Sequence, residues 1–350
     1  MGFIPSTDAR NLFTRELAAT FSDRVGVKSF FRSFFKEQES SAKNISIQVE
    51  REDQNIAIDI LRSTEGTLNS WDSQTEKIFT PPYYEEKFYA TDLEAYESLY
   101  VDREISSIAF GKFLKTAANK VEGLYNKIDR AYELQAAQSL LTGIVSLSAG
   151  VNIDFKRKAA SLIAFGAGND WSLTTIDPNT IILQGAAFIK EIGKAEGGTF
   201  NIIMGTLAFE AYKNNTFVKA RNQGFQYGMD QLIPAQREAV GCSYHGTTSI
   251  GSFNFRLWTY PEVYKNPTTG VQSKYMDDKK ILILPEITNN VLSYAATPLV
   301  TPTAVIPVKG KFNYYELIDP LKRSHTMGVM SAGVAIPVAV DQAFTAQILV

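Results

Sequence analysis

The most regular alternation of apolar and polar positions in this 350-residue chain lies between residues 103 and 143. Apolar side chains recur there mostly every three or four residues, at Ile108, Leu114, Ala117, Val121, Leu124, Ile128 and Ala131. This spacing predicts one long amphipathic helix that stops at Gly143, because glycine is a common residue just after a helix. At 1.5 Å per residue, a helix of about 38 residues within this segment is about 57 Å long, longer than most helices of globular proteins.

Alternating or wholly apolar runs on both sides of this helix predict strands. They lie at 45–52, 55–63, 199–205, 279–286 and 333–350. Helical patterns at 179–197 and 206–215 flank one of these runs. The chain is therefore expected to mix helices with strands and to have its last apolar residues tied into a sheet.

A polar segment leads from the first strands into a stiff aromatic strip. Residues 63–77 contain a single aromatic side chain, Trp71, and predict a long exposed loop or hairpin tip. The strip that follows, IFTPPYYEEKFYATD at 78–92, contains Pro81 and Pro82, which fix φ and lack backbone donors. We expect this strip to be extended, and to be neither a helix nor a central strand.

Four phenylalanines form an apolar stripe in the charged segment 25–41: Phe30, Phe31, Phe34 and Phe35. One interpretation is that the stripe packs into the core of its own chain. The other is that it belongs to an arm that packs on another subunit.

Composition narrows the classes of function. The formal net charge of −2 gives no basic excess of the kind that drives nonspecific binding to nucleic acid. The single cysteine, Cys242, excludes an intramolecular disulfide, and the two histidines, His245 and His325, leave few candidates for a metal site or a general base. No apolar run approaches the roughly 18 residues that span a bilayer, and no signal-peptide pattern is visible. A reducing cytoplasm and no membrane partner are therefore expected.

One short stretch carries residues with catalytic potential. Cys242 and His245 stand three residues apart in GCSYHG, a spacing compatible with a nucleophile and its base. No third orienting group is evident, and the glycine–lysine stretches do not match a phosphate-binding loop. We therefore predict no catalytic residue, no cofactor and no metal site, and keep an α/β enzyme that uses Cys242 as an alternative.

The order of these elements resembles the major capsid proteins of tailed bacteriophages, in the lambda-like major capsid protein E family. The pieces that carry the resemblance are FTPPYYEEKFYATDLE, AYELQAAQSLLTGIVSL, VNIDF, IIMGTLAFEAYKNN, YPEVYKNPTTGVQSKYMDDKKILILPE and HTMGVMSAGVAIPVAVDQAFTAQIL. Each piece is weakly specific by itself. Their ordered succession over most of the chain is the stronger signal.

The resemblance implies an α+β protein with the Hong Kong 97-type capsid fold. It implies an N-terminal arm at 1–44, an extended loop with flanking strands at 45–90, a peripheral domain at 91–175 with its spine helix at 103–143, an axial domain at 176–311, and a return to the peripheral sheet at 312–350.

The resemblance also implies a head protein that assembles with itself into hexamers and pentamers of an icosahedral shell. The shell encloses double-stranded DNA, which it contacts non-specifically. Scaffold, decoration and portal proteins are candidate further partners, and the expected location is the virion, built in the cytoplasm of the bacterial host. Another ring-forming phage structural protein is the second alternative.

The residues expected at contacts between subunits lie on the arm, the extended loop and the strip: Phe30, Phe31, Phe34, Phe35, Arg51, Arg62, Glu65, Trp71, Lys77, Pro81, Pro82, Tyr83, Tyr84, Glu85, Glu86 and Lys87. Charges of both signs alternate along the loop, which suits electrostatic registration between neighbouring subunits. A solvated surface is the alternative for these charges, and closure of the subunit's own core is the alternative for the tyrosines.

Overall fold

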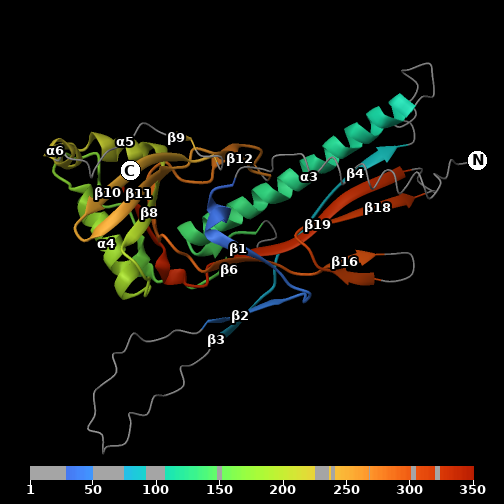
Figure 1. The fold of residues 1–350 in the computed structure, drawn as a ribbon, viewed down its shortest axis with the longest axis horizontal. Coiled ribbons are helices and arrows are strands. Elements are labelled where there is room, and N and C mark those ends of the chain that lie inside the picture. Colours follow the sequence, from blue (N-terminus) through green and yellow to red (C-terminus); the bar gives the residue numbers. More distant parts are fainter. Residues whose placement is uncertain are drawn as a thin grey trace, which may run out of the picture.

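The computed structural model describes residues 29–49, 75–91, 107–147, 152–224, 236–237, 241–267, 269–300, 305–319 and 324–350. Figure 1 shows an elongated molecule. A seven-stranded sheet with its helices occupies one end, and a long helix, α3 (Ser107–Leu141), lies beside a five-stranded sheet at the other. Two ribbons of paired strands leave the body near the five-stranded sheet.

Helix α3 confirms the predicted long helix, because it runs unbroken over 35 residues. Residues 103–106 of the prediction lie outside the described residues. Its buried side chains recur at helical spacing, and Val121, Ile128, Tyr132, Ala136 and Leu140 are each at most 1% exposed. This stripe packs on the five-stranded sheet in one hydrophobic core, so burial of one face stabilises the helix.

The five-stranded sheet is built around one long strand, β19 (Ser324–Ile336). β18 (Asn313–Asp319) pairs antiparallel along one side of it. Along the other side, β4 (Tyr83–Thr91) pairs with residues 324–332 and β15 (Asn290–Tyr294) with residues 333–336. β1 (Phe35–Glu39) pairs parallel with β15 and completes the sheet. The core-facing residues Met327 and Val329 are fully buried with α3.

The seven-stranded sheet has the order β7 (Leu162–Ile163), β20 (Phe344–Gln347), β14 (Lys280–Pro285), β8 (Thr199–Met204), β11 (Phe253–Thr259), β10 (Ser243–Ile250) and β9 (Gln236–Arg237). Helices α4 (Pro178–Glu191), α5 (Thr206–Asn214) and α6 (Thr216–Gly224) lie beside it. β8, β14 and α5 confirm the strands and the short helix predicted in this region.

The helix predicted at 179–197 is too long. α4 begins after Asp177, whose side chain accepts a hydrogen bond from the Asn179 amide, and it ends at Glu191. Lys194 and Gly197 have φ values of 52° and 79°, which are left-handed conformations that an α-helix does not contain.

The C-terminal part of the chain is shared between the two sheets. The resemblance implies that 312–350 returns to complete a peripheral sheet, and β18 and β19 both lie in the five-stranded sheet. β20 instead enters the seven-stranded sheet between β7 and β14. In the reverse direction, β15, within the segment assigned to the axial domain, lies in the five-stranded sheet because it pairs with β1 and β19.

Arg157 connects the end of α3 to β20. Its guanidinium donates to the carbonyl oxygen of Leu140 at 2.6 Å, to that of Ala343 at 2.6 Å and to Thr345 Oγ1 at 3.2 Å. It also donates to the hydroxyl and the carbonyl oxygen of Ser161. One side chain therefore donates hydrogen bonds both to a carbonyl oxygen at the C-terminus of α3 and to acceptors in and beside β20.

Four further short strands form two-stranded ribbons. β2 (Ile45–Val49) pairs with β3 (Thr75–Phe79), and β16 (Thr297–Val300) pairs with β17 (Val305–Val308). Two smaller hairpins are formed by β5 (Ile144–Val145) with β6 (Ile153–Asp154) and by β12 (Val263–Lys265) with β13 (Gln272–Lys274).

Candidate functional site

The two prolines of the aromatic strip join the β2–β3 ribbon to the five-stranded sheet. Pro81 is buried and Pro82 is half-buried, between the end of β3 and the start of β4. Among the described strands, β2 and β3 pair only with each other. Since both prolines have a fixed φ, the direction in which the ribbon leaves the sheet is restricted. The strip is extended, as predicted, and β4 hydrogen-bonds with β19 alone among the described strands.

One face of β4 packs on α3. The Tyr84 ring meets that of Tyr132 edge to face at 5.6 Å, and Gln135 Nε2 donates to the Tyr84 hydroxyl at 2.6 Å. The half-buried Glu86 carboxylate forms an ion pair with the Lys127 ammonium at 3.2 Å. Burial raises the pKa of the Tyr84 hydroxyl, although the contact with Gln135 acts in the opposite direction. Tyr84 therefore closes the core of its own subunit, which is the alternative named for the tyrosines of the strip.

The opposite face of β4 is open. Tyr83, Glu85, Lys87 and Tyr89 alternate with the core-facing residues and are exposed. The Glu85 carboxylate accepts a hydrogen bond from the Tyr315 hydroxyl at 2.6 Å and lies 3.8 Å from the Lys87 ammonium. Desolvation and the charge of Glu85 raise the pKa of Tyr83, so its hydroxyl stays neutral at physiological pH. This face presents two aromatic side chains around an acid and a base.

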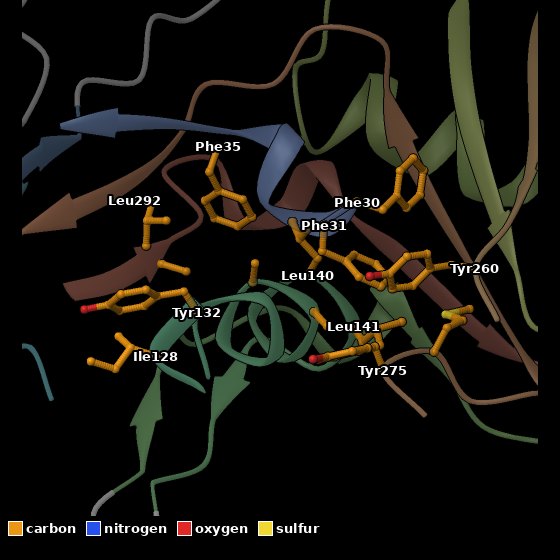
Figure 2. Packing of buried hydrophobic residues seen from close by; sticks show 14 of the residues in the cluster. Phe30, Phe31, Phe35, Ile128, Tyr132, Leu140, Leu141, Tyr260, Tyr275 and Leu292 are labelled. Atoms are coloured by element: carbon orange, nitrogen blue, oxygen red, sulfur yellow. The ribbon is translucent and has the colours of Figure 1, made fainter. Parts of the chain in front are cut away.

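The phenylalanines of the N-terminal stripe lie in the subunit's own core. Phe31 is 0% exposed, Phe30 4% and Phe35 7%, while Phe34 is half-buried. Figure 2 shows Phe30 and Phe31 beside Tyr260, and the ring centroids of Phe30 and Phe31 lie 5.5 Å and 5.4 Å from that of Tyr260. Phe31–Phe34 form a single 3-10 turn before β1 begins at Phe35. Phe30, Phe31 and Phe35 expose almost no surface to a neighbouring subunit, so we do not include them among the proposed contacts.

A buried carboxylate on α3 holds this turn in place. Glu133 Oε1 accepts hydrogen bonds from the amides of Phe30 and Phe31 at 2.9 and 2.8 Å, and Oε2 accepts from the amide of Arg32 at 3.1 Å. Its side chain is 0% exposed, and burial raises the pKa of Glu133 although the three amides favour the charged form. Glu133 thus supplies the acceptor for free amides at the start of the turn.

The sequence analysis did not single out Glu133, so it missed this role. The available signal was its spacing from Asp129, four residues earlier, because like charges at that spacing repel on a solvated helix. Both carboxylates have partners in the segment before β1, since Glu133 accepts from the amides of residues 30–32 and Asp129 pairs with Arg32 at 2.6 Å. Arg32 also contacts Glu37 at 2.6 Å. Lys311 joins the same network, 3.2 Å from Glu37 and 3.5 Å from Asp129.

This network predicts that acid weakens the attachment of residues 32–37 to the body. Burial acts against the charged form of Glu37, but the hydrogen bond from Arg32 and the charge of Lys311 outweigh it, so the pKa of Glu37 lies below its usual 4.5. A depressed carboxylate pKa contributes stability that is present above the unfolded pKa and lost as pH falls through the folded one.

We expect the native subunit to lose more unfolding free energy between about pH 5 and pH 3 than a Glu37→Gln variant does. Urea unfolding at a series of pH values measures the difference. Glu39→Gln, an exposed position on the same strand, is the matched control and should follow the native curve. Parallel curves for the native chain and Glu37→Gln would contradict the role given to this carboxylate.

Each residue of the possible catalytic pair lies in packed surroundings. Cys242 is 0% exposed and lies in the hydrophobic core. His245 Nε2 is 2.8 Å from Thr259 Oγ1, and its ring stacks on that of Phe209 with centroids 3.9 Å apart. Burial and the charge of Lys213 lower the pKa of His245. Cys242 and His245 therefore both contribute to packing and hydrogen bonding within the fold. In the described part of the chain, no group of residues has the composition of a metal site.

The remaining residues predicted at contacts lie partly beyond this description. Arg51, Arg62, Glu65 and Trp71 are outside the described residues, and Lys77 is described through its backbone, which pairs with Ile47 in the ribbon. Among the helices that the structure describes, none is long and apolar enough to cross a membrane.

Comparisons with known proteins agree with the geometry. The family model described as phage major capsid protein E matches residues 13–330. A putative capsid protein of a prophage from E. coli CFT073 shares 14% identity, with a TM-score of 0.65 over 96% of this chain and 98% of that chain. A phage-related protein from Bordetella bronchiseptica RB50 shares 10% identity, with a TM-score of 0.50 over 95% and 96%. A search of curated proteins gave no match.

These findings confirm the Hong Kong 97-type capsid fold and a structural rather than enzymatic protein. The match of the family model to most of the chain shows that this protein belongs to the phage major capsid protein E family and forms the shell of a phage virion.

Proposed function

We propose that copies of this chain assemble into hexamers and pentamers that close into an icosahedral shell around the double-stranded DNA of a tailed phage. The observation that carries this proposal is the β2–β3 ribbon, which leaves the body and pairs with no other strand of the described chain. A two-stranded ribbon is at best marginally stable in water by itself. Contact with a neighbouring subunit would supply the packing that the ribbon lacks.

The proposed domains correspond to the two sheets. Residues 1–44 serve as the arm and 45–90 as the extended loop. The five-stranded sheet with α3 is the peripheral domain, and the seven-stranded sheet with α4–α6 is the axial domain around the capsomer axis. β15 and β20 cross between these domains, as their pairing requires.

The proposed contacts use the loop residues Arg51, Arg62, Glu65, Trp71 and Lys77. They also use Pro82 and the open residues of β4, together with the half-buried Phe34 beside β1.

Other partners follow from the same role. Contact with packaged DNA is proposed to be weak and independent of sequence, since a subunit of net charge −2 leaves neutralisation of the genome mainly to small cations. Scaffold, decoration and portal proteins are proposed as further partners. Assembly is proposed to take place in the cytoplasm of the bacterial host.

A loop deletion tests the proposal. Replacing residues 50–74 by an Asn-Gly turn keeps β2 and β3 paired, because this dipeptide closes a two-residue hairpin. The variant is expected to melt at nearly the native temperature as an unassembled subunit, yet to give at least about tenfold fewer closed particles, since obligate contacts need a large buried area.

Negative-stain electron microscopy of native and variant chains, each expressed with the phage scaffold, measures particle yield. Native chains that remain monomeric at high concentration under these conditions would refute the proposed assembly. Closed particles from the deletion variant at native yield would instead show that the loop is dispensable.

A further inference from the structure

The open face of β4 exposes more aromatic surface than a solvated sheet face requires. Tyr83 is 46% exposed and Tyr89 is 58% exposed, at the two ends of a row that also holds Glu85 and Lys87. Leu317 on β18, on the same side of the sheet, is 50% exposed. Tyrosine is enriched where proteins meet because its ring buries much area and loses little freedom.

One glycine lets a tyrosine ring lie across this face. Gly328 on β19 stands in register with Lys87 on one side and Tyr315 on the other. A Cβ atom at this position would collide with the Tyr315 ring, so the ring lies across the glycine. From there the Tyr315 hydroxyl reaches the Glu85 carboxylate. This hydrogen bond holds the Glu85 carboxylate in a fixed position on the open face.

The order of side chains along the row is self-complementary. Alternate residues of a strand are about 6.7 Å apart, so the row from Tyr83 to Tyr89 spans about 20 Å. A two-fold axis that passes between Glu85 and Lys87 places Glu85 of each copy opposite Lys87 of the other. The same axis places Tyr83 opposite Tyr89. The sequence aromatic–acid–base–aromatic therefore matches itself when the second strand runs antiparallel.

We infer that the open face of β4 forms a two-fold symmetric contact with the same face of a second copy of this chain. The inference rests on the proposed assembly, which surrounds each subunit with identical copies. A symmetric contact uses the same patch on both partners and forms each favourable pair twice. The charge pairs fix the register of the two strands, and the tyrosines supply the buried area.

Cysteine cross-linking tests the register. The native Cys242 is 0% exposed, so it gives little background reaction. Particles are assembled from Tyr83→Cys chains, from Tyr89→Cys chains and from an equal mixture, and each is treated with a mild oxidant. Disulfide-linked dimers are expected in the mixture, with yields at least about tenfold lower in either single variant, because the two-fold axis separates identical positions by many ångströms.

Equal cross-linking in the single variants, or none in the mixture, would overturn the inference. The second result would mean that another partner, or solvent, covers this face.

A charge exchange tests the same contact without a covalent bond. Glu85→Lys alone places lysine opposite lysine, and Lys87→Glu alone places glutamate opposite glutamate, each twice per contact. Either change is expected to lower the yield of particles about tenfold or more, whereas the double variant restores opposite charges and is expected to regain most of the native yield. If the double variant assembles as poorly as the single ones, the contact is not symmetric and the inference is wrong.

Two measurements separate this inference from the proposed function. Melting of the unassembled variants should stay close to native, because exposed ion pairs contribute little to stability. Electron microscopy of native particles reports on shell assembly independently of β4. Closed particles of the native chain, together with no cross-link between positions 83 and 89 in the mixture of cysteine variants, would reject the β4 contact and leave the proposed shell intact.

Discussion

Replacing Glu133 with alanine is expected to destabilise the subunit by about 4 kcal/mol, because two buried amides and one part-buried amide lose their acceptor and each unsatisfied group costs about 1–3 kcal/mol. The amides belong to Phe30, Phe31 and Arg32. Loss of these three hydrogen bonds should also release residues 30–32 from α3. Glu133→Gln keeps one acceptor oxygen in a side chain of the same shape, so it should lose less. Urea unfolding of the unassembled subunit measures both changes as shifts of the midpoint.

Glu191→Ala provides the matched control for this experiment. Glu191 is exposed at the last turn of α4, so its removal should change stability by less than about 0.5 kcal/mol. If Glu133→Ala stays within about 1 kcal/mol of the native protein, the capping role assigned to Glu133 is wrong.

The second large effect is expected at Arg157, where replacement by methionine should cost about 3 kcal/mol because several acceptors lose a charged donor. Methionine preserves much of the side-chain length and apolar volume. It leaves the carbonyl oxygens of Leu140 and Ala343 without the hydrogen bonds that Arg157 donates. Arg157→Lys should recover only part of the loss, because one ammonium does not reproduce the planar fork of donors.

Thermal and urea unfolding of the unassembled chain measure this effect. Lys156→Met changes the neighbouring cation, whose side chain is 81% exposed and pairs with Asp154, and it should be nearly neutral. Equal destabilisation by the two methionine variants would show that Arg157 acts through general charge rather than through its hydrogen bonds.

The elements that the sequence predicted well are those whose pattern is local. The spacing of Val121, Leu124 and Ile128 predicts α3 because a helix shows its buried face in its own periodicity. The apolar runs that become β8 and β14 are likewise continuous in the sequence, as expected for strands that are buried within a sheet. For such segments, tertiary contacts reinforce the local preference.

The features that the sequence left open depend on distant partners. The spacing of Phe30, Phe31, Phe34 and Phe35 does not reveal a 3-10 turn followed by a strand, because β1 is fixed by parallel pairing with β15. Glu133 is an ordinary polar residue until the arm brings three amides to it. The open face of β4 is equally invisible in the sequence, since it is defined by the packing of α3 on the other face.

The central place of β19 also limits when the protein can fold during synthesis. β4, β15 and β18 all pair with this strand, which is completed only at Ile336. At roughly 5–20 residues per second, translation from the end of α3 to that point takes about 10–40 seconds. During this interval the apolar stripe of α3 has no sheet to cover it, so a nascent chain is prone to chaperone binding and to aggregation. Because the β4 face takes shape only when β19 arrives, an unfinished chain lacks the surface proposed above for contact with a second copy.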